Sequence, residues 1–126
     1  MNWYFWLMDK VNIEEKLSLI SDYWNPRIAG ELNGQFVKLV KFKGAFTWHK
    51  HDNEDELFFV LKGSFKMELR NKTITINENE FFIVPKGVEH RPVADEEVAV
   101  MLFEPASTLN TGNVENEFTK HNLSTI

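Results

Sequence analysis

The chain has 126 residues, carries 14 Lys and Arg against 19 Asp and Glu for a formal net charge of −5, and contains no cysteine. This length suits one domain with an apolar core of its own. Without cysteine there can be no disulfide, zinc–thiolate site or iron–sulfur cluster, so any metal must be bound through nitrogen and oxygen. The acidic balance and scattered basic residues argue against nucleic acid as a partner.

The most apolar terminal stretch runs from Met1 to Met8 and is followed by Asp9. It is too short to span a bilayer, and it lacks the positive lead and small-residue cleavage site of a secretory signal. We therefore expect no membrane association and a cytoplasmic location. We also expect residues 1–7 to be dispensable for the fold, with Met8 as an alternative start.

A short helix is predicted over about residues 12–22. Asn12 is a good N-cap and Glu15 follows three positions later, which together form a capping box. Apolar residues then recur at helical spacing. The helix should end before Pro26, because the residue that precedes a proline avoids helical backbone angles.

After this helix the pattern becomes typical of strands, with β-branched and aromatic runs separated by turn signals such as Asn33-Gly34 and Lys86-Gly87. The predicted strands are Gln35 to Lys43, Leu57 to Leu61, Ser64 to Arg70, Thr73 to Ile76, Phe81 to Val84 and Val98 to Glu104. So many short strands predict an all-β barrel or sandwich with its core at about residues 34–105. The remainder, about residues 107–126, reads as a polar tail.

Two predicted strands, Leu57 to Leu61 and Phe81 to Val84, are apolar at every position instead of alternating. Such runs are typical of strands that are covered on both faces. In a small barrel the outer cover comes from a second subunit or from a packed terminal segment. We predict a homodimer, because a chain of this length has little to spare for covering itself.

The residues with the clearest chemistry are His49, His51 and Glu56. Two histidines two positions apart project from the same face of a strand and can reach one ion. Glu56 leads directly into a buried apolar run, where a carboxylate is costly unless a positive charge neutralises it. A metal ion would provide that charge and hold the imidazoles in their neutral form. Each residue alone could equally be a surface or hydrogen-bonded group.

The spacing of these residues resembles the two sequence motifs of the cupin superfamily. The first motif is matched by Gly44, His49, His51, Glu56 and Gly63, and the second by Asn79, Pro85, Gly87 and His90. Asn79 stands where the second motif usually has glycine. Two motifs at a compatible separation are far more specific than a lone pair of histidines.

This resemblance implies a single cupin domain over residues 1–126, a jelly-roll β-barrel with a short N-terminal helix. It also implies one divalent metal ion bound inside by His49, His51, Glu56 and His90. These ligands suit manganese, iron, nickel, cobalt or zinc, and the sequence does not choose among them. A six-coordinate ion would keep two further positions open for water or substrate, which favours chemistry over mere bracing.

Two functions remain open on the sequence alone. The first is a metal-dependent isomerase, lyase or dioxygenase acting on a small oxygen-rich molecule, with its acid and base residues unidentified. The alternative is a non-catalytic module that binds or senses a small molecule, because one fold serves many activities. Arg70, Arg91 and Glu104 could contact a polar substrate, but we interpret them as members of surface ion pairs. We interpret His121 as exposed.

Phe46, Phe58, Val60, Met67 and Phe103 are possible lining residues of the site, although residues of these types are more often plain core. Trp48 should point away from the neighbouring His49 and pack elsewhere, because adjacent residues of a strand face opposite sides.

Overall fold

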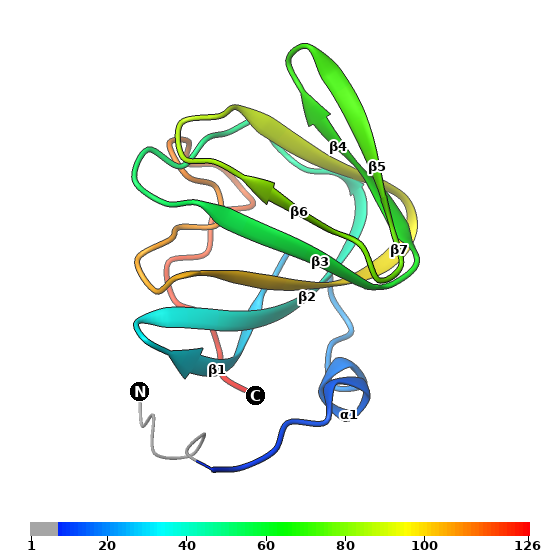
Figure 1. Cartoon of the computed structure of the whole chain (residues 1–126), viewed down its shortest axis with the longest axis vertical. Helices are drawn as coiled ribbons and strands as arrows, with labels where there is room; N and C mark the ends of the chain where they lie inside the picture. The colour runs from blue at the N-terminus through cyan, green and yellow to red at the C-terminus, as the bar shows by residue number, and fades with distance from the viewer. Residues whose placement is uncertain (1–7) are drawn as a thin grey trace.

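The computed structural model describes residues 8–126, so the expectation for residues 1–7 lies outside the part described here. One helix and seven strands make up the fold (Figure 1): α1 (Ile13–Leu17), β1 (Arg27–Leu32), β2 (Gln35–Ala45), β3 (Glu56–Lys62), β4 (Ser64–Leu69), β5 (Lys72–Asn77), β6 (Phe81–Val84) and β7 (His90–Pro105). Within residues 8–126 no helix is long and apolar enough to cross a membrane.

All strand pairs are antiparallel, and β7 connects them. The sheet order is β1-β2-β7-β3-β6, while β4 pairs with both β5 and β7. Residues 90–93 of β7 pair with β4, and residues 99–103 pair with β3. One long strand therefore connects the β4–β5 hairpin to the rest of the sheet. The sheet therefore wraps around an enclosed interior (Figure 1), which confirms the predicted all-β jelly-roll barrel.

The interior is packed by residues that alternate along the strands. On β2, Val40 and Phe42 face inward, and Phe58 on β3 does the same. Trp24 stacks on Phe42 with ring centroids 4.4 Å apart. Aromatic side chains of this kind bury large apolar areas and dominate the energetics of a small core.

The outer face of the sheet is covered only in part. Leu17 of α1 and the C-terminal Ile126 pack against a second cluster that includes the buried Leu39 on the outer side of β2. Phe81 and Ile83 on β6, by contrast, are 59% and 48% exposed in the single chain. The chain therefore covers the β1–β2 side of its outer face and leaves the β6 side open.

Three sequence expectations need correction. The helix ends at Leu17, not at about residue 22, because i→i+3 hydrogen bonds end the helix and carry the chain toward the buried Ile20. The sheet begins at Arg27, ahead of the expected residue 34. Strand β1 was missed because it contains Gly30, where the β1–β2 register shifts at a bulge.

The third correction concerns residues 107–126, which fold back onto the barrel. Thr111 is fully buried, and Phe118 lies 5.1 Å from Phe46 between ring centroids. Near the end of the chain, Thr125 forms an isolated parallel bridge with Ile28. The segment is packed by tertiary contacts although its own sequence shows no sustained period.

Candidate metal centre

The four predicted ligands come from three places in the fold. His49 and His51 lie in the connection between β2 and β3, Glu56 is the first residue of β3, and His90 is the first residue of β7. His49 and His90 exchange two backbone hydrogen bonds, of 3.1 and 2.9 Å, in an isolated antiparallel bridge. This His49–His90 bridge places the two imidazoles beside each other, although His49 is not part of a regular strand.

All four side chains converge inside the barrel. One candidate ligand atom from each lies within 4.8 Å of the others, and all four residues are buried. Nε2 of His51 and Nε2 of His90 lie 3.2 and 3.5 Å from the same Glu56 oxygen, Oε1. The structure therefore brings together the four residues that the resemblance implied as metal ligands.

The hydrogen bonds of two histidines set which ring nitrogen faces the centre. Nδ1 of His49 lies 2.9 Å from the carbonyl oxygen of Thr47, and Nδ1 of His90 lies 2.9 Å from that of Val88. Because a carbonyl only accepts, each Nδ1 carries the proton and each Nε2 keeps a lone pair. Backbone partners of this kind orient metal-binding histidines in known sites.

Burial and neighbouring charges prepare the same groups for binding a cation. Burial and the nearby His90 together lower the pKa of His49 to about 4, so the ring is neutral at pH 7. Burial alone would raise the pKa of Glu56, but the close approach of the His51 and His90 rings to its carboxyl group holds that pKa well below its usual range. The site thus offers a neutral imidazole at His49 and an ionised carboxylate at Glu56.

Several polar atoms at the centre have no hydrogen-bond partner among residues 8–126. They are both ring nitrogens of His51, Oε1 of Glu56 and Nε2 of His90. Buried polar atoms are seldom left in this state, because each unpaired group is costly. Nitrogen and carboxylate donors that converge without partners fit a divalent ion bound between them.

The C-terminal segment supports this centre from outside. The backbone nitrogen of Lys50 donates to Oδ1 of Asn113 at 2.9 Å, and the nitrogen of Asn113 donates to the carbonyl oxygen of Lys50 at 3.0 Å. Gly112, with φ of +54°, lies directly against Lys50 and His51. The position of His51 therefore depends on a segment that the sequence had marked as a tail.

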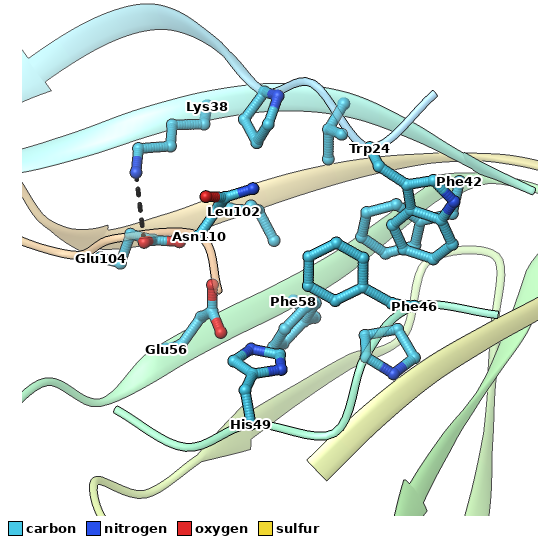
Figure 2. Close-up of a pocket in the computed structure, with 13 residues that line it drawn as sticks. Trp24, Lys38, Phe42, Phe46, His49, Glu56, Phe58, Leu102, Glu104 and Asn110 are labelled. Atoms are coloured by element: carbon cyan, nitrogen blue, oxygen red, sulfur yellow. Dashed lines mark hydrogen bonds and ion pairs between the residues drawn. The ribbon is translucent and has the colours of Figure 1, made fainter. Parts of the chain in front are cut away.

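A pocket beside the centre has one apolar wall and one polar wall. Its apolar wall includes Trp24, Phe46 and Phe58, whereas Lys38, Glu104 and Glu56 lie next to one another on the polar side (Figure 2). About 30 Å³ of the pocket is open to the centres of water-sized molecules, which corresponds to roughly two or three waters.

Glu104 is the residue that the sequence analysis misplaced. It is 1% exposed and pairs with the equally buried Lys38 at 3.2 Å, so it is not part of a surface ion pair. Lys38 was missed altogether. The missed signal is its place in an apolar strand, two and four positions before the inward-facing Val40 and Phe42.

The other predicted residues lie where their sequence context suggested. Arg91 pairs with Glu68 at 2.8 Å, and His121 has an exposed side chain. Trp48 lies under the guanidinium group of Arg70, 3.8 Å from ring centroid to Cζ, outside the pocket. Among the possible lining residues, Phe46 and Phe58 line the pocket.

Val60, Met67 and Phe103 do not line it. Val60 and Met67 are fully buried in the core. Phe103 is half-buried and belongs to the other face of β7, because it alternates with the pocket residues Leu102 and Glu104.

Comparison with known proteins agrees with this architecture. The sequence pattern of the cupin domain matches residues 36–104, more than half of the chain, and the protein therefore belongs to the cupin family. The Bacillus subtilis protein YdbB is 39% identical over 62 residues, which are 48% of this chain and 55% of that protein. The matched segment thus spans about half the length of this relative.

Two crystal structures are similar over most of their length. A cupin-2 domain containing protein from Shewanella frigidimarina is 42% identical with a TM-score of 0.75, covering 75% of this chain and 93% of that one. Protein NMB1881 from Neisseria meningitidis is 31% identical with a TM-score of 0.72, covering 78% and 100%.

Proposed function

We propose that this cupin binds one divalent metal ion through His49, His51, Glu56 and His90 and acts as an enzyme on a small oxygen-rich molecule. The observation that supports this proposal best is the convergence of four buried ligand atoms within 4.8 Å. Three neutral imidazoles and one carboxylate would leave a bound divalent ion with a net charge of about +1. Such an ion supplies Lewis acidity toward oxygen atoms of a ligand.

The residues around the centre have separable roles in this proposal. The carbonyl oxygens of Thr47 and Val88 accept hydrogen bonds from the Nδ1–H groups of His49 and His90. The Nε2 lone pairs of both rings therefore stay available for the ion. Phe46 and Phe58 form an apolar wall that excludes water from one side of the pocket. Polar groups on the opposite side leave room for a ligand that carries several oxygens.

Alanine substitutions of the four ligands test the metal site directly. Each variant should retain at least tenfold less metal than the parent after dialysis against a weak chelator, measured by elemental analysis, because each removes one bond to the ion. The matched control is His121→Ala, which removes an imidazole from an exposed position. If His49→Ala and His90→Ala retain as much metal as the parent, the proposed metal site is wrong.

A second candidate function is a non-catalytic module that binds or senses a small molecule. It is favoured by the small size of the pocket, of which about 30 Å³ is open to the centres of water-sized molecules. The metal-loaded protein can be screened against sugars, diketones and hydroxy acids. Turnover of any of them supports the enzyme, whereas binding without turnover supports the module.

A further inference from the structure

We propose that Lys38 and Glu104 form the ligand-recognition side of the pocket, and that they select a small molecule carrying a hydroxyl group beside its metal-chelating oxygens. This inference rests on the metal-binding function proposed above and specifies its ligand class. It follows from three features of the pair: its position, its unused hydrogen-bonding groups and the size of the pocket.

The first feature is the position of the pair on the inner wall. Lys38 lies on β2 and Glu104 on the neighbouring β7, and the register that pairs Lys38 with Leu102 brings the two side chains together diagonally. Figure 2 shows the Glu104 carboxyl group between Lys38 and Glu56. The pair therefore lies directly beside the candidate metal ligand Glu56.

A buried ion pair needs a reason other than stability. Lys38 and Glu104 are each 1% exposed. Removing two charges from water costs about as much as their attraction returns, so an apolar pair of the same volume would serve the core equally well. Two charged groups placed on the wall of a pocket, inside an otherwise apolar barrel, indicate recognition of a polar ligand.

The second feature is that each member of the pair has unused hydrogen-bonding capacity. Within residues 8–126, Nζ of Lys38 donates one hydrogen bond, to Oε2 of Glu104, although an ammonium group has three protons. Oε1 of Glu104 is buried and accepts no hydrogen bond. The wall thus presents a spare donor next to a spare acceptor.

A hydroxyl group is the ligand feature that fits this arrangement. It accepts from the ammonium through its oxygen and donates its proton to the carboxylate, so both spare groups are satisfied at once. A carboxylate at the same position would meet Lys38 but be repelled by the ionised Glu56, and burial together with Glu56 already raises the pKa of Glu104. An apolar group would leave the spare donor of Lys38 and the spare acceptor of Glu104 without partners, which a buried site penalises strongly.

The third feature, the size of the pocket, limits the ligand. The space open to the centres of water-sized molecules is about 30 Å³ beside the metal ligands. A compact molecule whose oxygens replace two or three waters matches this space. Glycerate and lactate are suitable probes, because both can chelate a metal through the carboxylate and the 2-hydroxyl, and only glycerate has a further hydroxyl group.

The test compares these two probes on Co²⁺-loaded protein, with changes in the visible absorption of the ion as the readout. The parent should bind glycerate at least tenfold more tightly than lactate. In the double variant Lys38→Met/Glu104→Leu, which replaces the pair by apolar side chains of similar size and should fold, the ratio should fall to about one. Retained Co²⁺ absorption would show that the variant is intact.

The matched control is Arg27→Met/Asp22→Asn, which removes an ion pair of 3.1 Å outside the pocket and should leave the ratio unchanged. Equal affinity for glycerate and lactate in the parent, or a preference that survives the loss of Lys38 and Glu104, would overturn this inference while the metal site stands. Failure of the parent to bind Co²⁺ at all would overturn the proposed function, and this inference with it.

Discussion

The substitution Gly112→Ala tests whether the C-terminal segment positions the metal centre. A Cβ atom at Gly112 would overlap the carbonyl oxygen of Lys50 and lie 2.8 Å from its carbonyl carbon and 3.2 Å from Nδ1 of His51. Because two of these atoms belong to the backbone, the two segments must move apart. Separation would break both hydrogen bonds between Lys50 and Asn113.

The expected loss of stability follows from these contacts. A non-glycine residue at φ of +54° costs about 1 kcal/mol, and two broken hydrogen bonds add about 1 kcal/mol each. We therefore expect Gly112→Ala to lower the free energy of unfolding by about 3 kcal/mol, which is roughly 10 °C in Tm. Metal retention should also fall at least tenfold, because His51 moves with Lys50.

The control is Gly34→Ala, at a position with φ of +76° where an added Cβ meets no atom within 4 Å. It carries the same backbone strain without the overlap, so it should cost about 1 kcal/mol and leave metal retention unchanged. Thermal unfolding of the metal-free proteins and elemental analysis after dialysis measure the two effects. Equal losses for the two variants, with metal retained by both, would show that the C-terminal segment does not hold His51.

Three further predictions concern the whole molecule. Sedimentation at micromolar concentration should give twice the chain mass. The variant Phe81→Glu, which places a charge on the exposed side of β6, should sediment as a monomer. A monomeric parent would contradict the predicted homodimer. In denaturant titrations, the free energy of unfolding of the metal-free protein should fall by about 2 kcal/mol between pH 7 and pH 5. The reason is that His49 takes up a proton near pH 6.5 in the unfolded chain but only near pH 4 in the folded chain. A His49→Gln variant should lose less. Deletion of residues 1–7 should leave Tm unchanged.

The residues that the sequence identified reliably are those tied to short, regular spacings. The predicted strand Phe81 to Val84 is observed with the same limits, and the four ligands lie together as the motifs implied. Asn79 replaces the usual glycine of the second motif and adopts φ of +67°, a conformation that asparagine tolerates better than most residues. A local requirement for a positive φ angle can therefore be recognised from the residue type at that position.

Features that depend on contacts between residues distant in the chain were harder to predict from the sequence. Residues 107–126 appear polar, yet Thr111 is buried because its hydroxyl group is bonded within the segment, to the carbonyl oxygen of Val114 at 2.8 Å. A polar residue whose partners lie in its own loop can be buried without any apolar pattern. No periodicity could have indicated that this segment supports His51.

Lys38 and Glu104 show why a polar residue in a strand should be interpreted by the face on which it lies. Each lies two positions from an inward-facing apolar residue, Val40 on β2 or Leu102 on β7. Because residues two apart on a strand share a face, strand periodicity already places both inside the barrel. Charge type alone suggested the surface, because most Lys and Glu residues are exposed. Where periodicity and residue type disagree in this way, the disagreement marks a polar group whose burial must be compensated. Here it marks the side of the pocket next to the proposed metal ligand Glu56.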